Sequence, residues 1–488
     1  MHEHNNEEEH APLPPIKKTT RPVNPASFVV CGITGDLSKK KLIPALWNLY
    51  KKGNLPVTFY IIGFSDQHLD RGQYHDLLKH SLDSKNLIEN PEEFEAFFEH
   101  CSYAQGEFHD VQAFVRLKDL IVENESKKGI CGDKIFHLAV PPHLYEAIFQ
   151  KLHESGLADM CGGAGGWTRI LVEKPFGDDW NTAFELDKKL GGLFREEQIF
   201  RVDHYLGKES VENILAFRFS NSLFENTWNK DYVEKIHVRI WEDIGVEARG
   251  AFYDSVGALR DVGQNHILQM FALIAMERPG VFTADAVRAE REKVLSSLSA
   301  IKLQDLHEFA HRAQYQGFRG EPNVNPESQT ETYFYLRAFV DNDRWQGIPF
   351  FLEGGKRMGT AKTEIKVYFR KKEEPLLPAE AGLNVQNVLT FSISPDEGIS
   401  LSIFAEELGL ATTLKEYKLA FEQHAPGQHF LEPDAYERVI YNCIVGDQTI
   451  FTSTKEVLAS WEFITPILHN WLGNQLEEYP HGWKPLFE

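Results

Sequence analysis

Two short clusters of polar residues combine the side chains that proton transfer and anion binding require. Residues 201–208 read Arg-Val-Asp-His-Tyr-Leu-Gly-Lys, which places a carboxylate, a phenol and basic groups side by side. Phosphate groups bind to such mixtures, although a single cluster of this kind is more often a polar loop closed by an Asp–His hydrogen bond. Residues 260–266 read Arg-Asp-Val-Gly-Gln-Asn-His within an otherwise apolar helical pattern, where unpartnered polar groups would be costly to bury. Two such clusters in one chain indicate a shared site.

Lys174 is a third candidate, because it follows directly after a short apolar run at residues 169–172 that predicts a buried strand. The carboxyl ends of parallel strands are where open α/β sheets bind ligands. We therefore expect Lys174 to lie close to the two polar clusters.

A glycine turn, Gly32-x-x-Gly35, separates a predicted strand at residues 27–31 from a predicted helix. Such a turn offers backbone N–H groups and a helix N-terminus to a pyrophosphate. It departs from the G-x-G-x-x-G pattern, and similar turns occur in proteins that bind nothing. The next predicted strand ends near Asp66, where an acidic residue would hold the ribose 2′-hydroxyl of NAD. A helix N-cap or a solvated aspartate is the alternative interpretation of Asp66.

The elements that position these residues fall into two groups. Strands predicted at residues 27–31, 57–64, 134–140 and 169–172 alternate with helical stretches, which indicates a parallel sheet in a Rossmann-like, dinucleotide-binding α/β domain over residues 26–205. Residues 1–25 show no apolar periodicity and are expected to be a disordered tail. Residues 161–166 are expected to form a glycine-rich surface loop.

The second half has a different pattern. Polar and apolar residues alternate at residues 234–240, 331–340, 364–370, 387–393, 399–405 and 416–421. This alternation predicts a large, mainly antiparallel sheet with one face in water. Helices are expected at residues 283–298 and, carrying the second polar cluster, at residues 254–276. Residues 206–488 therefore read as an α+β domain for substrate binding and oligomerisation.

Composition limits the partners. The formal net charge of −21 repels nucleic acid and anionic lipid, so neither is expected as a partner. The five cysteines are widely spaced and form no C-x-x-C pair, which is typical of reduced thiols. No apolar run is long enough for a membrane helix and no signal peptide is evident, so we expect a cytoplasmic protein without membrane contact.

Several motifs in order make the sequence similar to the glucose-6-phosphate dehydrogenase family, from about residue 26 to residue 471. They are Gly32-Ile-Thr-Gly-Asp-Leu-Ser-Lys-Lys-Lys41, Leu138-Ala-Val-Pro-Pro142, Val172-Glu-Lys-Pro-Phe-Gly177, residues 201–208, residues 260–266, Gly355-Lys356 and Pro433-Asp-Ala-Tyr-Glu-Arg438. Their joint order is far more specific than any one of them.

The resemblance implies oxidation of C1 of glucose 6-phosphate to the lactone, with hydride transfer to NAD or NADP and no metal. His266 would be the general base, and Asp203 would orient it. His204, Tyr205 and Lys208 would bind the sugar phosphate. Further contacts to the substrate would come from Lys174, Glu242, Asp261 and Lys356.

The resemblance also implies the cofactor-binding residues Gly32, Thr34, Gly35, Asp36, Leu37, Asp66, Pro142, Tyr145 and Lys174. NADP-dependent members carry an arginine after the second strand, whereas this chain reads Gly63-Phe-Ser-Asp66. A carboxylate facing the 2′-phosphate is repulsive, so NAD should be favoured. Arg71 or the lysines at 39–41 are the residues that could rescue NADP binding.

A homo-dimer or tetramer is expected.

Two other functions compete with this interpretation. A cofactor-binding sensor that had lost catalysis would lack the base or its carboxylate, and both His266 and Asp203 are present. A dehydrogenase of unphosphorylated sugars would leave the basic groups of His204 and Lys208 unpaired.

Overall fold

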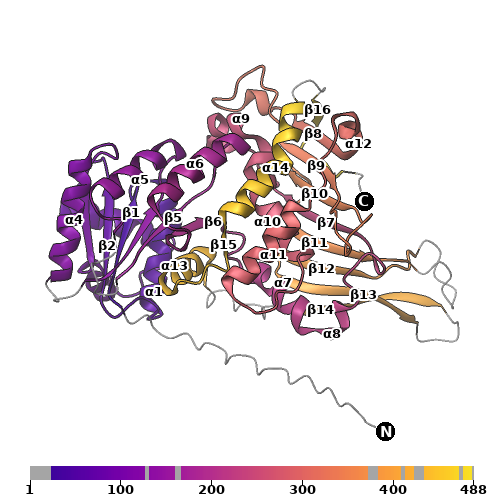
Figure 1. Cartoon of the computed structure of the whole chain (residues 1–488), viewed down its shortest axis with the longest axis horizontal. Helices are drawn as coiled ribbons and strands as arrows, with labels where there is room; N and C mark the ends of the chain where they lie inside the picture. Colours follow the sequence, from indigo (N-terminus) through magenta and orange to yellow (C-terminus); the bar gives the residue numbers. More distant parts are fainter. Residues whose placement is uncertain are drawn as a thin grey trace, which may run out of the picture.

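A computed structural model describes residues 24–126, 131–159, 166–371, 383–407, 413–422, 433–471 and 476–485. The chain forms two sheet-based halves joined by helices (Figure 1). Most of the expected tail and of the expected loop at 161–166 lies outside the described residues. None of the described helices is long and apolar enough to cross a membrane.

The N-terminal half is built on a seven-stranded sheet in the order β15-β6-β5-β4-β1-β2-β3. Its strands are β1 (Ala26–Cys31), β2 (Phe59–Ser65), β3 (Cys101–Gln105), β4 (Asp133–Leu138), β5 (Thr168–Val172), β6 (Ile199–Val202) and β15 (Phe451–Thr452). The strands β1 to β6 pair in parallel, and β15 pairs antiparallel with β6. All the residues of β1, β4 and β6 are buried, because helices cover both faces of a parallel sheet.

The helical segments of this half are η1 (Ser38–Leu42), α1 (Ile43–Lys51), α2 (Arg71–Asp83), α3 (Pro91–Phe98), α4 (Val111–Ser126), η2 (Pro142–Leu144), α5 (Tyr145–Glu154), α6 (Trp180–Leu193) and η3 (Glu196–Gln198). The expected Rossmann-like fold is confirmed. The domain boundary at residue 205 stays a prediction, and β15 adds a strand from the far end of the chain to this sheet.

The C-terminal half contains a nine-stranded sheet in the order β14-β13-β12-β11-β7-β10-β9-β8-β16. Its strands are β7 (Val233–Trp241), β8 (Ala310–Tyr315), β9 (Tyr333–Ala338), β10 (Phe350–Gly355), β11 (Lys362–Phe369), β12 (Val388–Ser394), β13 (Gly398–Glu406), β14 (Leu414–Glu422) and β16 (Glu477–Tyr479). The sheet is mainly antiparallel, as expected, but β10 pairs in parallel with β7 and β16 with β8.

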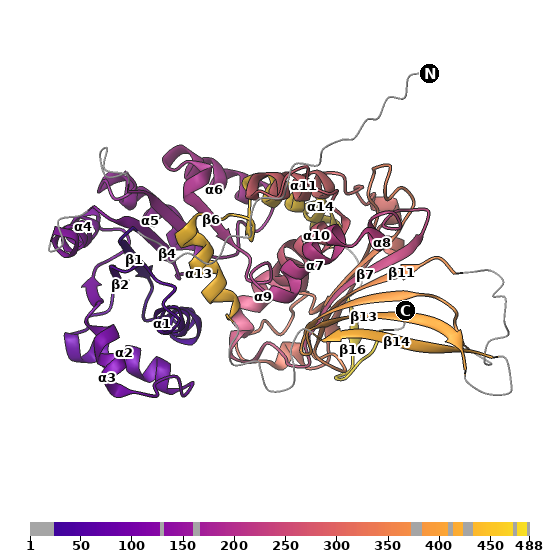
Figure 2. The same ribbon diagram turned by 90° about the horizontal axis from the view of Figure 1, so that it is seen from below.

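Helices pack against this second sheet and between the two halves (Figure 2). They are α7 (Glu209–Ser220), α8 (Ser222–Glu225), η4 (Glu247–Arg249), α9 (Gly250–Ala258), η5 (Leu259–Ile267), α10 (Leu268–Ala275), α11 (Ala284–Ser296), η6 (Leu303–Asp305), α12 (Leu306–Phe309), η7 (Phe318–Gly320), α13 (Ala435–Val445) and α14 (Thr454–Trp471).

The prediction of one continuous helix at residues 254–276 is wrong, because the structure divides this segment into α9, η5 and α10. Gly257 has a φ of 77°, which interrupts the helix, and η5 is a π-helix between α9 and α10. π-Helical turns are rare and occur frequently at functional sites. The irregular segment is the one that carries the second polar cluster.

The cysteines also differ in part from expectation. Cys31, Cys101 and Cys443 are buried free thiols. Cys131 is disulfide-bonded, so the expectation of reduced thiols fails there.

Candidate active site

The carboxyl ends of four parallel strands bring candidate residues to one edge of the seven-stranded sheet. Gly32 follows β1, Pro142 lies beyond β4, Lys174 follows β5 and Asp203 follows β6. The segment η5 of the second half meets this edge, since Nζ of Lys174 lies 2.7 Å from the backbone oxygen of Asp261. The site therefore lies between the two halves of the chain, at the edge where α/β sheets bind ligands.

His266 and Asp203 form a buried hydrogen-bonded pair. Nδ1 of His266 lies 2.6 Å from Oδ1 of Asp203, and each side chain is 2% exposed. The backbone N–H of Tyr205 donates to the same oxygen at 2.9 Å. An ionised carboxylate can only accept hydrogen bonds, so the proton of the imidazole is on Nδ1 and the lone pair is on Nε2.

Lys174 contacts the other nitrogen of the ring. Its Nζ lies 2.9 Å from Nε2 of His266 and 3.3 Å from Oδ1 of Asp261. An ammonium group can only donate, so Nε2 accepts, in agreement with the tautomer set by Asp203. His266 thus presents Nε2 as the nitrogen that can take up a proton.

Burial and neighbouring charges set the protonation states of these groups. Burial alone would raise the pKa of Asp203, but the adjacent His266 imidazole lowers it to about 2. Burial would also raise the pKa of Asp261, and Lys174 and Lys356 lower it to about 2. Burial, together with Lys174, lowers the pKa of His266 below its ordinary value, although Asp203 opposes that shift. At neutral pH the site holds two carboxylates and a neutral imidazole.

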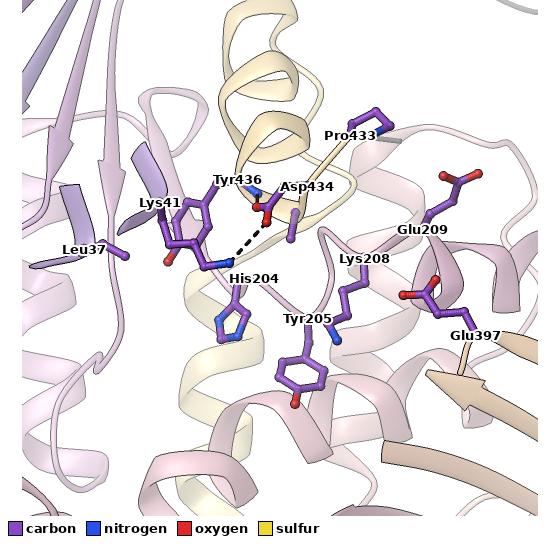
Figure 3. A pocket seen from close by; sticks show the side chains of 11 residues that line it. Leu37, Lys41, His204, Tyr205, Lys208, Glu209, Glu397, Pro433, Asp434 and Tyr436 are labelled. Atoms are coloured by element: carbon purple, nitrogen blue, oxygen red, sulfur yellow. Dashed lines mark hydrogen bonds and ion pairs between the residues drawn. The ribbon is translucent and has the colours of Figure 1, made fainter. Parts of the chain in front are cut away.

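His204, Tyr205 and Lys208 line a cavity of about 560 Å³ beside this pair (Figure 3). The rings of His204 and Tyr205 lie 4.6 Å and 4.4 Å from the His266 ring. Nζ of Lys208 lies 4.8 Å from the centre of the Tyr205 ring. The lining of the cavity thus includes the imidazole of His204 and the ammonium group of Lys208, and the His266 ring lies next to His204 and Tyr205 without lining the cavity itself.

His204 does not carry the positive charge that the sequence suggested. Burial, the His266 ring and Lys174 lower the pKa of His204 well below its ordinary value. Burial also lowers the pKa of Lys208, and Glu397 opposes that shift. Lys208 is therefore the stronger candidate for pairing with an anion, and His204 contributes a neutral imidazole.

Lys356, Glu242 and Asp261 form a second charged group near Tyr205. Nζ of Lys356 lies 2.5 Å from Oε2 of Glu242 and 5.1 Å from the centre of the Tyr253 ring. Burial raises the pKa of Tyr205 to about 12, and the charges of Glu242 and Asp261 add to the shift. Carboxylates and an ammonium in this arrangement can accept from and donate to several hydroxyl groups.

Seven of the eleven residues that line the cavity are not among the site residues predicted from the sequence. Lys41 and Asp434 form an ion pair at 3.2 Å, and Asp434 also accepts from the N–H of Tyr436 at the start of α13 (Figure 3). The run Pro433–Arg438 was part of the family resemblance, but nothing indicated its place. Glu397 lies between β12 and β13, and no sequence signal could have found it.

At the glycine turn after β1, the backbone packs closely against the segment that follows β4. Gly32 has a φ of 85°, and a Cβ atom there would lie 2.4 Å from the backbone oxygen of Ala139. The N–H of Gly35 donates to the Gly32 oxygen at 3.0 Å, and the Thr34 hydroxyl lies 3.4 Å from that of Ser65. Only glycine fits at position 32, because the turn packs against the backbone of Ala139. A tight strand–turn–helix connection of this kind is where dinucleotides bind in Rossmann-like domains.

Three other cofactor-binding candidates, two at the same turn and one at the start of α5, differ in exposure. Asp36 is exposed and pairs with Lys40 at 2.8 Å, and Leu37 lines the large cavity. Tyr145 is buried, and its hydroxyl donates to the backbone oxygen of Glu173 at 2.9 Å. The hydroxyl of Tyr145 is therefore engaged within the protein, where it supports the end of β5.

Asp66 is exposed directly after β2. It is not a helix cap, because Asp70 caps α2 and accepts from the N–H of Gln73. Arg71 pairs with Glu99 at 3.0 Å. The alternative of an N-cap at position 66 is therefore wrong, and Arg71 has an acidic partner of its own.

Two family models match consecutive parts of the chain. Residues 29–213 match the NAD binding domain of glucose-6-phosphate dehydrogenase, and residues 215–485 match its C-terminal domain. The chain belongs to the glucose-6-phosphate dehydrogenase family. It is therefore an oxidoreductase, and the resemblance found in the motifs is confirmed.

Named relatives match along nearly the whole chain. The glucose-6-phosphate 1-dehydrogenase of Chlamydia muridarum is 36% identical over 470 residues, which is 92% of this chain and 90% of that protein. The enzyme of the same name from Streptococcus pneumoniae is 37% identical over 469 residues, covering 93% of this chain and 92% of its own length. A solved glucose-6-phosphate dehydrogenase in complex with its substrate glucose 6-phosphate superposes with a TM-score of 0.88 at 33% identity and covers 96% of both chains.

Proposed function

We propose that the protein oxidises C1 of glucose 6-phosphate to 6-phosphogluconolactone and transfers hydride to NAD or NADP, the entry step of the pentose phosphate pathway. The observation that carries the proposal is the Asp203–His266 pair beside Lys174, at the ligand-binding edge of the first sheet. The experiment measures reduction of NAD and of NADP by purified protein, with glucose 6-phosphate, with glucose and without sugar. Reduction that depends on glucose 6-phosphate is expected, and equal rates with glucose would contradict the substrate assignment.

His266 would act as the general base. The C1 hydroxyl would replace Lys174 as the hydrogen-bond partner of Nε2, and its proton would pass to that nitrogen as the C1–O bond becomes a carbonyl. The nicotinamide, when bound, accepts the hydride that leaves C1. Asp203 would hold the ring in the required tautomer and stabilise the imidazolium that forms.

The cavity would hold the sugar phosphate at the Lys208 end, with His204 and Tyr205 as hydrogen-bonding partners. Glu242, Asp261, Lys174 and Lys356 would contact the sugar hydroxyls. We assign no metal, although Asp203, His204 and His266 place ligand atoms within 4.8 Å of one another. The ammonium of Lys174 beside Nε2 of His266 opposes a cation there.

The dinucleotide would bind along the turn from Gly32 to Leu37, with Pro142 and Lys174 on the sides of its site. NAD is favoured over NADP by Asp66, which is exposed where the ribose is expected. Arg71 is a weaker candidate for binding the 2′-phosphate of NADP, because it pairs with Glu99. Among the lysines at 39–41, Lys40 pairs with Asp36 and Lys41 with Asp434.

Asp66→Arg is expected to shift the ratio of kcat/KM for NADP over NAD upward by about tenfold or more. The change removes one repulsion of the 2′-phosphate and adds a charge-assisted partner, each of which contributes on the order of 1 kcal/mol. Initial rates with both cofactors measure the ratio, and Asp70→Ala is a control that removes a nearby carboxylate from the helix cap. A wild type that prefers NADP, with a ratio unmoved by Asp66→Arg, would show that Asp66 points away from the ribose.

The pH dependence of kcat/KM is expected to reflect the protonation of His266. Because the pKa of His266 is lowered, activity should persist below the pH at which an ordinary histidine becomes protonated, and should fall only at lower pH. Asp203 raises this pKa and Lys174 lowers it, so Asp203→Asn should move the acid limb to lower pH and Lys174→Met to higher pH. Both variants lose activity, but the opposite directions of the two shifts are the test. Shifts in the same direction, or none, would mean that the acid limb belongs to another group.

A cytoplasmic location and a homo-dimer or tetramer remain predictions. A relative from Arabidopsis thaliana that is 35% identical over 464 residues carries the word cytoplasmic in its name. The excess of 72 acidic over 51 basic residues supports the absence of nucleic acid and anionic membrane partners.

A further inference from the structure

A very small cavity lies behind the Asp203–His266 pair. Its volume is about 10 Å³, which is the space that one water molecule requires. The residues that line it come from β6, η5, α10, β15 and α14, and from the segments that follow β5 and β6. They are Phe176, Val202, Asp203, Gln264, Asn265, Gln269, Thr452, Val457 and Ser460.

Three of these residues indicate that the cavity holds a polar molecule. Oδ2 of Asp203, Oε1 of Gln269 and Oγ of Ser460 are buried atoms with no hydrogen-bond partner among the described residues. The three residues are 2%, 2% and 1% exposed. Buried polar atoms are nearly always satisfied by protein or by ordered water, and an unpaired carboxylate oxygen is the most costly to bury of the three.

The donors and acceptors of the three atoms suit a single water molecule. The Asp203 oxygen and the Gln269 oxygen are acceptors, and the Ser460 hydroxyl can donate. A water molecule has two protons to give and can accept the third hydrogen bond, so all three atoms are satisfied at once. Three hydrogen bonds are the usual number for a buried water.

We propose that Gln269 and Ser460 are positioning residues of the catalytic pair, and that they act through one buried water molecule bound to Oδ2 of Asp203. The inference rests on the proposed function, in which Asp203 orients His266. Oδ1 of Asp203 is already held by His266 and by the Tyr205 N–H. The water would hold the second oxygen and so fix the plane of the carboxylate, which sets the direction of the hydrogen bond to Nδ1.

Water fits the site better than a cation does. The imidazole next to Asp203 becomes positively charged when it accepts a proton, and a cation on the opposite side of the same carboxylate would oppose that charge. A water molecule leaves the negative charge of Asp203 available to His266.

A crystal structure of the full chain at high resolution tests the water directly. One density peak is expected at hydrogen-bond distance, about 2.7–3.0 Å, from all three oxygen atoms. A second cavity of about 10 Å³ provides an internal control, because its lining is apolar apart from His137. That cavity should be dry. A peak at the shorter distances of a metal ion, no peak, or a direct Ser460–Asp203 hydrogen bond would overturn the proposal.

Kinetics test the positioning role. Ser460→Ala and Gln269→Leu should each lower kcat by roughly tenfold, the usual effect of losing a hydrogen bond to a charged group, and should leave KM for glucose 6-phosphate nearly unchanged. In an Asp203→Asn background the same changes should cost less than twofold, because the carboxylate through which they act has been removed.

The control variant is Val457→Ala, which enlarges the same cavity but removes no polar atom. It should lower the thermal stability and leave kcat within about twofold of wild type. Equal losses from Ser460→Ala in both backgrounds would mean a purely structural role and would overturn the proposal. If His266→Asn and Asp203→Asn alone leave turnover intact, the proposed function itself fails, whatever occupies the cavity.

Discussion

The His266→Asn variant is expected to lose about 10²–10⁴-fold or more in kcat while it still binds glucose 6-phosphate. Asparagine keeps a polar side chain of smaller size but has no nitrogen that can accept a proton at neutral pH. The substrate contacts expected at Lys208 and Tyr205 remain. Single-turnover reduction of the nicotinamide would measure the loss, and a thermal-shift titration with glucose 6-phosphate would measure the binding.

A matched control is His237→Asn in β7. His237 is also buried, at 3% exposed, but it lies on the second sheet and burial lowers its pKa to about 2, so it stays neutral. Its replacement should reduce stability and leave kcat per folded molecule near that of wild type. Asp203→Asn should lose less than His266→Asn, because it disturbs the tautomer and the charge but leaves the base in place. Near-normal turnover of the His266 variant would mean that another group takes the C1 proton.

The regular elements could be predicted because their patterns are local. The alternation in residues 234–240 corresponds to β7, and the capped helix expected at residues 283–298 is α11, whose N-cap Thr283 accepts from the N–H of Ala286. Alternation and capping depend on side chains a few residues apart, so one sequence contains the whole signal. The family resemblance supplied the candidate residues of the site in the same way, as short motifs.

What could not be predicted depends on distant contacts. Strand β10 contains two glycines and no alternation, and it is a central strand because it pairs with β7 on one side and with β9 on the other. The pair Lys41–Asp434 joins residues 393 positions apart. The interruption at Gly257 places a Cβ position 2.4 Å from Oε1 of Glu331, a contact that no local pattern indicates. The low pKa of His204 likewise comes from its burial and from the His266 ring beside it.

The low pKa of His204 makes Lys208 the decisive residue for phosphate recognition. Lys208→Ala is expected to raise KM for glucose 6-phosphate by about 10- to 100-fold, because a charge-assisted contact to a dianion contributes on the order of 1.5–3 kcal/mol. The kcat/KM for free glucose, which has no phosphate, should change by less than about threefold. Initial rates over a range of both sugars measure the two effects.

Lys235 offers a matched control, since its Nζ lies 4.6 Å from the centre of a tyrosine ring, much as Nζ of Lys208 lies 4.8 Å from that of Tyr205. Lys235 is in β7 and outside the cavity, so Lys235→Ala should leave both sugars unaffected. Lys208→Arg keeps the charge and should recover part of the affinity, whereas a neutral change should not. Equal losses on glucose and on glucose 6-phosphate would assign Lys208 to the packing of Tyr205. The phosphate would then be bound by Lys41, which lines the same cavity and would have to exchange Asp434 for the substrate.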